Sequence, residues 1–219
     1  MNPAIQVKKV NKSFKGIPVL QDVDLSVDQG SICGIIGRNG SGKTVLFKCI
    51  CGFLQIDRGE ILINGTVSKK GQPHKDLGII IENPGFLRHY SGYKNLEFLM
   101  GLNGKVDKGK INYVLDLVGL SAEKNKRVGK YSMGMRQRLG IAQAIMENQS
   151  ILILDEPMNG LDNQGVEDIR GLFLRLQEAG CTILLASHNR EDIRQLCDVV
   201  YEMDLGHIKK LDGQLKKHN

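Results

Sequence analysis

The chain has 219 residues with a formal net charge of +6, and its 41% hydrophobic and 25% charged residues are typical of a globular protein. A chain of this length buries a sizeable core, so it requires neither a structural metal nor a disulfide framework. Its N-terminus has no apolar stretch of signal-peptide length, and apolar runs such as residues 151–154 are far shorter than a membrane span, so we expect a soluble, cytoplasmic protein.

The first third of the chain alternates or clusters its apolar residues between turn signals. We expect strands near residues 4–10, 18–27, 31–36, 60–63 and 77–81. A glycine-rich loop and a helix from about 42 to 52 follow the third of these strands, and Asp57-Arg58-Gly59 predicts a turn. The Asn64-Gly65 pair makes residues 60–63 one arm of a hairpin.

The middle of the chain has helical spacing of its apolar residues, around residues 95–100, 111–118 and 134–147, and Gly119 is placed to end the second helix. The last third alternates strands with helices again. We expect strands near 151–154, 182–186, 199–203 and 207–211, and helices near 164–178 and 190–197. This alternation implies crossover connections and a largely parallel sheet. We therefore expect one α/β domain, with its core in residues 1–82 and 151–219 and a helical insert at about 83–150.

A phosphate-binding loop is the strongest motif of the chain. It follows G-x-x-x-x-G-K-[ST] and consists of Gly37, Arg38, Asn39, Gly40, Ser41, Gly42, Lys43 and Thr44. Its glycines allow backbone N–H groups to point inwards, and the N-terminus of the following helix adds partial positive charge. Lys43 can then reach the β- and γ-phosphates, and the Thr44 hydroxyl can bind Mg²⁺. A glycine loop that only turns the chain would not account for Lys43 and Thr44, so we predict binding of a Mg-nucleoside triphosphate.

Two adjacent carboxylates, Asp155 and Glu156, end the apolar strand 151–154. Asp155 suits an indirect ligand of Mg²⁺, and Glu156 suits a general base that orients and polarises the attacking water. Two acidic residues after a strand are often only a solvated strand end. Because a phosphate loop precedes them in the chain, we interpret them as a catalytic pair.

Residues 131–138, Tyr-Ser-Met-Gly-Met-Arg-Gln-Arg, resemble the ABC signature motif, usually written L-S-G-G-Q. Other motifs stand in the order of that superfamily: Phe14 at the place of the adenine-stacking aromatic, residues 159–162 at the D-loop, and Ser187-His188 at the switch histidine. The resemblance spans nearly the whole chain. It implies an ABC ATPase fold, in which a P-loop NTPase core with a mostly parallel sheet is joined by an N-terminal antiparallel β part and a helical insert.

The resemblance also implies a homodimer that encloses ATP and Mg²⁺ between its subunits. The residues of the site would be Phe14, the loop Gly37–Thr44, Glu82, Asp155, Glu156 and His188 of one subunit, and Ser132 and Gly134 of the other, with Asp162 coupling the two sites. Each assignment has an ordinary structural alternative. Phe14 suits core packing, His188 suits a capping role, and Ser132 suits the start of a helix.

Three positions depart from the family pattern. Val45 stands where the family often has a second hydroxyl near the α-phosphate, a loss of about 0.5–1.5 kcal/mol. Met135 stands in place of the signature glutamine, so it offers no side-chain amide there. Glu82 replaces a glutamine; its oxygen can serve Mg²⁺, and its charge adds to those of Asp155 and Glu156. The alternative for Glu82 is a solvated strand end.

Glu82, with Asn83-Pro84 and the segment from Phe86 to Tyr93, resembles the ATPases of bacitracin- and lantibiotic-type resistance exporters. Phe86, Leu87, His89 and Tyr90 either belong to the core of the insert or border a groove that accepts a helix of the membrane subunit. We therefore expect two copies of this chain to bind separate permease subunits at the inner face of the membrane.

Two other classes of protein remain as alternatives. The first is a soluble ABC ATPase that acts on nucleic acid or ribosomes, with which the basic charge is compatible; lysines at both ends of the chain suit a solvated face, anionic lipid or nucleic acid alike. Such relatives generally carry two ATPase domains or an extra insertion, so we expect no direct nucleic-acid partner. The second, a P-loop phosphotransferase or GTPase-like switch, leaves residues 132–137 unexplained. The five cysteines have no zinc-type spacing, and we expect buried free thiols.

Overall fold

The computed structural model describes residues 3–72, 74–82 and 85–211 of the chain. Asn83-Pro84, which contributed to the predicted resemblance to resistance exporters, lies outside the described residues, as do the C-terminal lysines Lys216 and Lys217.

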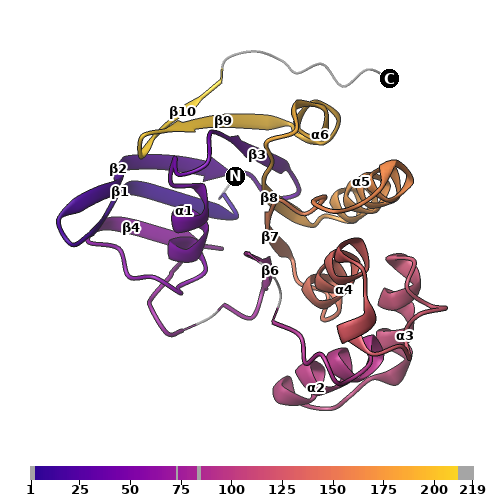
Figure 1. The fold of residues 1–219 in the computed structure, drawn as a ribbon. Helices are drawn as coiled ribbons and strands as arrows, with labels where there is room; N and C mark the ends of the chain where they lie inside the picture. Colours follow the sequence, from indigo (N-terminus) through magenta and orange to yellow (C-terminus); the bar gives the residue numbers. More distant parts are fainter. Residues whose placement is uncertain (1–2, 73, 83–84, 212–219) are drawn as a thin grey trace.

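Two sheets form the framework of the molecule (Figure 1). The first sheet is antiparallel and has the order β2-β1-β4-β5, with β1 at Ile5–Phe14, β2 at Ile17–Val27, β4 at Arg58–Ile63 and β5 at Thr66–Val67. The second has the order β10-β9-β3-β8-β7-β6, with β3 at Ile32–Ile36, β6 at Leu77–Ile80, β7 at Ile151–Asp155, β8 at Thr182–Ala186, β9 at Val199–Asp204 and β10 at His207–Lys210. All neighbours in the second sheet run parallel except β9 and β10. The predicted mostly parallel sheet and the antiparallel β part are thus confirmed.

The helices lie where the apolar spacing predicted them. They are α1 (Lys43–Ile50), α2 (Gly92–Asn103), α3 (Lys108–Leu117), α4 (Met133–Ile145), α5 (Asn163–Glu178) and α6 (Arg190–Leu196), with a short 3₁₀ turn at Val128–Lys130. From α2 onwards each α-helix begins at a Ser, Asp or Asn whose side chain accepts a hydrogen bond from a first-turn N–H. Such caps satisfy N–H groups that have no partner within the helix.

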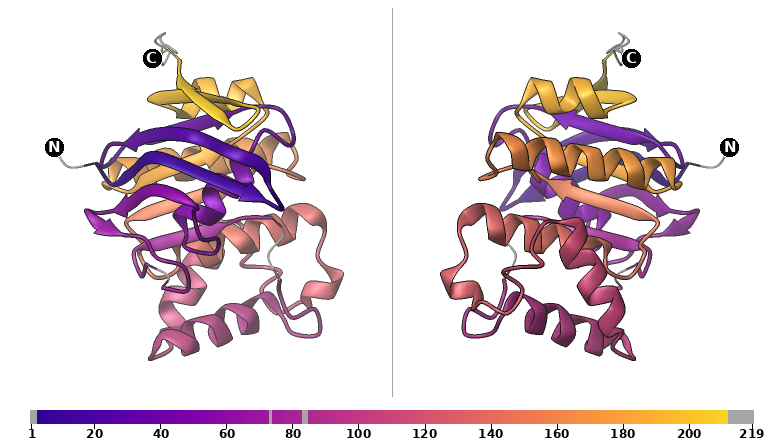
Figure 2. Two further views of the ribbon diagram at one scale, coloured as in Figure 1. Left: turned by 90° about the vertical axis from the view of Figure 1, so that its left-hand side faces the viewer. Right: turned by 90° about the vertical axis from the view of Figure 1, so that its right-hand side faces the viewer.

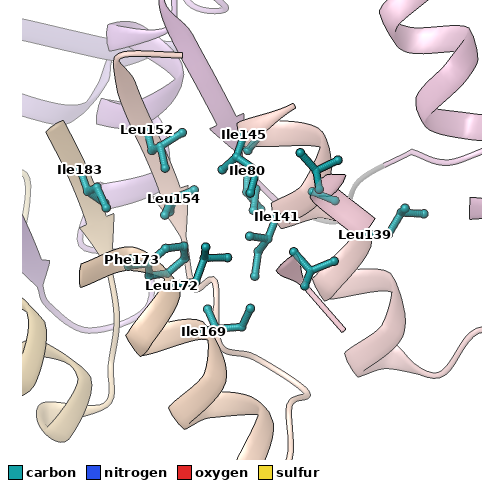
Figure 3. Packing of buried hydrophobic residues seen from close by; sticks show 14 of the residues in the cluster. Ile80, Leu139, Ile141, Ile145, Leu152, Leu154, Ile169, Leu172, Phe173 and Ile183 are labelled. Carbon is teal, nitrogen blue, oxygen red and sulfur yellow. The ribbon is translucent and has the colours of Figure 1, made fainter. Parts of the chain in front are cut away.

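The parallel sheet is covered on both faces, which explains why its central strands are continuously apolar. Side chains alternate between the two faces, so Ile151 and Ile153 of β7 pack towards α1 and the antiparallel sheet, whereas Leu152 and Leu154 pack towards α4 and α5. Figure 3 shows the second of these layers, in which Leu152 and Leu154 of β7 belong to one cluster with Phe173 of α5. The buried side chains therefore hold α1 on one face of the sheet and α4–α6 on the other (Figure 1).

Helices α2, α3 and α4 gather at one end of the molecule, as both views in Figure 2 show. They share a core that includes Leu96 of α2, Ile111 of α3 and Leu139 of α4. Helix α4 also packs on β6, where Gly78 lies directly beneath the backbone of Ala144. All three helices fall within the predicted insert at about 83–150, but the division of the chain into core and insert stays a prediction.

The prediction of a turn at Asp57-Arg58-Gly59 was wrong, because Arg58 and Gly59 already belong to β4. The register between β1 and β4 shifts between Lys8 and Asn11, so the β1 backbone bulges towards β4. Gly59 has a φ of +94°, and a Cβ there would lie 2.4 Å from the carbonyl oxygen of Lys9. The glycine therefore marks close backbone approach at a bulge, which from sequence alone resembles a turn.

The five cysteines are buried free thiols, as predicted. Desolvation raises the pKa of the Cys33 thiol to about 12 and that of the Cys181 thiol to about 11, so both stay neutral in the folded protein at ordinary pH. Within the part of the chain that the structure describes, no helix has the length and hydropathy needed to span a bilayer.

The contact between β6 and α4 leads to a first prediction. In Gly78→Ala, the new Cβ would lie 1.9 Å from the Ala144 carbonyl oxygen, so α4 must move away from β6. We expect a loss of about 1–3 kcal/mol or more in the free energy of unfolding, measured by denaturant titration. Gly85→Ala is the matched control, because a Cβ at Gly85 would meet nothing within 4 Å. Equal stability of the two variants would contradict the packing of α4 described here.

Candidate functional site

A cavity of about 680 Å³ opens where the carboxyl ends of β3, β6 and β7 meet the start of α1. It is lined by Val19, Asn39, Gly40, Ser41, Gly42, Lys43, Thr44, Val45, Glu82, Met133, Gln137, Asp155, Glu156 and Asn159. The carboxyl edge of a parallel sheet is the usual ligand site of open α/β folds. The phosphate loop and the acidic residues that the sequence singled out thus share one cavity.

The loop between β3 and α1 curls around the ammonium group of Lys43. Lys43 Nζ donates to the carbonyl oxygen of Gly37 at 2.7 Å and to that of Arg38 at 3.2 Å. Gly37 itself touches β9, where a Cβ would lie 2.2 Å from the carbonyl oxygen of Met203, so no larger residue fits. The sequence G-x-x-x-x-G-K therefore produces a tight loop with a cation at its centre.

Two features of this loop fit a bound anion. Lys43 is only 7% exposed and has no carboxylate partner among the described residues, so its charge is balanced by carbonyl dipoles alone. Ser41 Oγ is buried, and within the described ranges it has no hydrogen-bond partner. A buried cation and an unpaired hydroxyl are both costly unless a ligand completes them. Phosphate oxygens beside the N-terminus of α1 would satisfy both groups.

Thr44 and Asp155 form a second part of the site. Thr44 Oγ1 donates to Asp155 Oδ2 at 2.6 Å, which joins the first turn of α1 to the end of β7. A hydroxyl and a carboxylate are oxygen ligands of the kind that Mg²⁺ takes beside nucleotide phosphates. The donor set therefore fits the predicted metal.

Glu156 and His188 form the third part. The Glu156 N–H donates to the carbonyl oxygen of Ala186 at 2.9 Å, so the residue after β7 is tied to the end of β8. Glu156 Oε2 then lies 2.8 Å from His188 Nδ1. Glu156 also has a φ of +51°, an uncommon conformation for a residue with a side chain. Such conformations persist where the surroundings determine them, and they are frequent at functional sites.

Glu82 lines the same cavity from the end of β6 and shares this unusual backbone, with a φ of +61°. Lys48 of α1 donates to Glu82 Oε1 at 2.6 Å. The pair is partly exposed, with 28% of the Lys48 side chain and 63% of the Glu82 side chain accessible, so its energetic contribution is modest. The contact balances the charge that Glu82 adds next to Asp155 and Glu156. Nothing in the sequence pattern pointed to Lys48 as the partner.

Other predicted residues do not line this cavity. Gly37, Arg38 and His188 border a neighbouring hollow of about 840 Å³ formed with β9 and β10. Ser132 and Asp162 cap α4 and α5, where their side chains accept from the N–H groups of Met135 at 3.1 Å and Gly165 at 2.9 Å.

Gly134 is close to the 159–162 segment, since a Cβ on it would lie 2.7 Å from the carbonyl oxygen of Gly160. Met135 packs against the core of the helices. The signature and D-loop segments are therefore in contact within one subunit.

Phe14 is exposed at the end of β1, and it too is absent from the cavity lining. Lys12 Nζ lies 5.3 Å from the centre of the Phe14 ring and also bonds to Asp57 Oδ1 at 2.8 Å. The hydrogen bonds from Lys12 and from the Ser13 N–H hold the pKa of Asp57 below its usual value. An exposed ring steadied by a cation remains available for stacking, so the role of Phe14 stays a prediction.

Four lining residues were not predicted as site residues: Val19, Met133, Gln137 and Asn159. Met133, Gln137 and Asn159 belong to the signature and D-loop segments, so the motifs marked their location but not their contact with the cavity. Gln137 is 9% exposed and donates to the Pro157 carbonyl oxygen at 2.9 Å, which ties α4 to the turn after Glu156. Val19 comes from β2, and no sequence signal connects it to the loop.

Comparison with known proteins supports the predicted resemblance. The family model described as "ABC transporter" matches residues 20–159. The bacitracin transport ATP-binding protein BcrA of Enterococcus faecalis is 40% identical over 95% of this chain and 68% of its own length. The lantibiotic transport ATP-binding protein SrtF of Streptococcus pyogenes is 31% identical over 95% of this chain and 92% of its own. The ADP conformation of an ATP-binding cassette from an ABC transporter superposes with a TM-score of 0.84 at 25% identity, covering 98% of this chain and 92% of that one.

The phosphate loop leads to a second prediction. Lys43→Ala removes the cation that the loop encloses, so we expect nucleotide affinity to fall by at least about tenfold, the effect of losing 1.4 kcal/mol. Equilibrium titration with a fluorescent ATP analogue measures this. Lys108→Ala, an exposed lysine at the start of α3 and outside the cavity lining, is the control and should bind the analogue normally. Normal affinity of Lys43→Ala would contradict the phosphate-loop assignment.

Proposed function

This chain belongs to the ABC transporter family, and we propose that it is the ATP-hydrolysing subunit of an exporter of antimicrobial peptides. The observation that carries the ATPase mechanism is the single cavity that joins the phosphate loop to Asp155 and Glu156. The peptide cargo rests on relatives named for bacitracin and lantibiotic transport and on Glu82 in the place of the usual glutamine.

In the proposed mechanism the loop Gly37–Thr44 and Lys43 hold the triphosphate, with the α1 N-terminus directed at its charge. Thr44 and Asp155 would hold Mg²⁺, with Glu82 as a further oxygen ligand, and the metal's charge would offset that of the β- and γ-phosphate oxygens. Glu156 accepts a hydrogen bond from the attacking water and polarises it. His188, in contact with Glu156, would bind the γ-phosphate.

A second copy of the chain completes each site in this proposal. Ser132 is exposed at the N-terminus of α4, and Gly134 lies in its first turn, so a helix N-terminus is available to phosphate oxygens of a facing subunit. Gly134 also abuts the 159–162 segment that carries Asp162, which gives a physical route between the two sites. Nucleotide between the subunits would favour the closed dimer, and hydrolysis would release it.

The permease contact is proposed at a groove of about 420 Å³ between β6, α2 and α4. Its lining includes Phe53 and Leu102, which are 51% and 82% exposed. Leu87 and Tyr90, predicted to belong either to the insert core or to the border of such a groove, are also exposed but do not line this one, and Tyr90 packs edge-on against Phe98. An apolar groove with exposed large side chains suits an amphipathic helix. Binding there would hold this subunit at the cytoplasmic face of the membrane.

The role of Glu156 leads to a third prediction. Glu156→Gln keeps the shape of the side chain but removes the base, so we expect ATP to bind while turnover falls at least a hundredfold. ATP would then accumulate between subunits and trap a dimer, detected by light scattering with Mg-ATP. Glu178→Gln, an exposed residue at the far end of α5, is the matched control and should hydrolyse ATP normally. A Glu156→Gln protein that stays monomeric at high ATP would count against the shared site.

The transporter assignment has its own test. We expect tagged Glu156→Gln protein, purified from detergent-solubilised cells of its source with Mg-ATP, to retain a polytopic membrane protein identifiable by mass spectrometry. The Lys43→Ala protein, which cannot be locked by ATP, is the control and should retain less. Recovery of ribosomal proteins or nucleic acid alone would overturn the exporter and leave the ATPase assignment in place.

A further inference from the structure

We propose that a buried ion pair between Arg170 and Asp192, acting through Ser187, positions His188 for ATP hydrolysis. The inference rests on the proposed role of His188 at the γ-phosphate. It concerns residues that lie outside both the phosphate loop and the cavity lining. The sequence motifs marked Ser187, beside the switch histidine, but neither Arg170 nor Asp192.

The three residues form a continuous chain of hydrogen bonds beneath the loop between β8 and α6. Arg170 of α5 donates to Asp192 of α6 through Nε at 3.0 Å and also through Nη2. The second oxygen of Asp192 accepts from Ser187 Oγ at 3.1 Å. Ser187 Oγ in turn accepts from the Asn189 N–H at 3.1 Å. The loop that carries His188 is therefore curled around one hydroxyl, and that hydroxyl is fixed by the ion pair.

The Arg170–Asp192 pair is buried, so its contribution to stability does not by itself explain its presence. Arg170 is 6% exposed, Asp192 2% and Ser187 2%, so the charges and the hydroxyl have lost nearly all contact with water. The attraction within a buried ion pair often only offsets the cost of removing both charges from water. Nonpolar residues of α5 and α6 such as Phe173 and Leu196 already hold these helices together. The ion pair instead fixes the orientation of the Asp192 carboxylate, because a planar guanidinium and a carboxylate allow few relative orientations.

His188 needs such a constraint because packing cannot supply it. Its side chain is 66% exposed, and its described contacts are the ring bond to Glu156 Oε2 at 2.8 Å and a long backbone N–H bond to the same oxygen at 3.4 Å. When Glu156 turns to a water molecule, the loop backbone is what keeps the ring in place. The residues on either side of His188 are held through one oxygen. The Asn189 N–H donates to Ser187 Oγ, and Ser187 Oγ itself donates to Asp192.

The ion pair also connects two segments of the proposed dimer site. Arg170 lies on α5, the helix that Asp162 caps, whereas Asp192 lies on α6, the helix that follows His188. A movement of the N-terminal end of α5 would therefore be transmitted to the loop of His188 through the Arg170–Asp192 contact. The geometry gives the D-loop segment a mechanical connection to the switch histidine within one subunit.

The test compares Ser187→Ala with Thr182→Val in the full chain. Both residues are buried, Thr182 at the start of β8 and Ser187 directly after its end, and each variant loses one hydrogen-bonding hydroxyl, but Thr182 Oγ1 accepts from the Gly30 N–H at the opposite end of the strand. We expect Ser187→Ala to lower kcat for ATP hydrolysis about tenfold, as misplacement of a positioned group does, with KM changed less than about twofold. Thr182→Val should keep kcat, although we expect its melting temperature to fall about as much as that of Ser187→Ala.

A double-mutant cycle with His188→Ala assigns the cause. If Ser187 acts through His188, Ser187→Ala in the His188→Ala background lowers kcat no further. Asp192→Asn, which turns an amide N–H towards Ser187, should behave like Ser187→Ala. A slow His188→Ala protein alongside a normal Ser187→Ala protein would overturn the positioning role alone. An equal further loss in both backgrounds would overturn it as well. A His188→Ala protein with normal turnover would overturn both the proposed role of His188 and this inference.

Discussion

Parallel pairing of β3, β7 and β8 is the constraint on which the site depends. The carboxyl ends of parallel strands lie at the same edge of a sheet, so the direction of the strands alone brings the loops after them together. The pairing register sets Ile35 beside Ala186 and Asp155 beside Ala186, which brings the phosphate loop, the acidic pair and the histidine loop to one edge. The strands must be covered on both faces for this pairing to be stable, and α1 on one side and α4–α6 on the other provide that cover.

The charges at this edge are arranged for a ligand that carries charge of its own. Lys43 is enclosed by carbonyl groups, whereas Asp155 and Glu156 each touch a neutral or titratable partner, Thr44 and His188. Within the described residues, Glu82 is the one carboxylate of the cavity that is paired with a lysine, Lys48, from outside the cavity lining. A triphosphate brings negative charge to Lys43 and Ser41, and a cation between it and the carboxylates balances the rest. The cavity therefore suits a triphosphate together with a cation better than it suits either of them alone.

Backbone conformation and side-chain chemistry coincide at two of these residues. Glu82 and Glu156 both follow short buried strands and both have positive φ values, +61° and +51°. A side chain in that region costs free energy, which the hydrogen bond from the Glu156 N–H to Ala186 and the ion pair of Glu82 help to offset. The turn directs each carboxylate towards the cavity instead of along the strand. The buried contacts among Arg170, Asp192 and Ser187 act in a similar way, because these polar groups hold the loop of His188, whose exposed side chain is not held by packing.

The sequence by itself determined the local elements and the identity of the motifs. Apolar spacing located α5 and β8, residues 37–44 predicted a phosphate loop, and Asp155-Glu156 predicted a catalytic pair, because each of these signals lies within one short stretch of chain. The roles of the loop and of the pair stay predictions. The bulge at Gly59 was mistaken for a turn, since a single glycine permits both and only the approach of β1 distinguishes them. Val19, Lys48 and the partners Arg170 and Asp192 carried no signal, because each acts on a residue far away in the chain. Tertiary structure alone decided them: contacts between distant segments depend on strand order and helix packing, which short-range patterns do not encode.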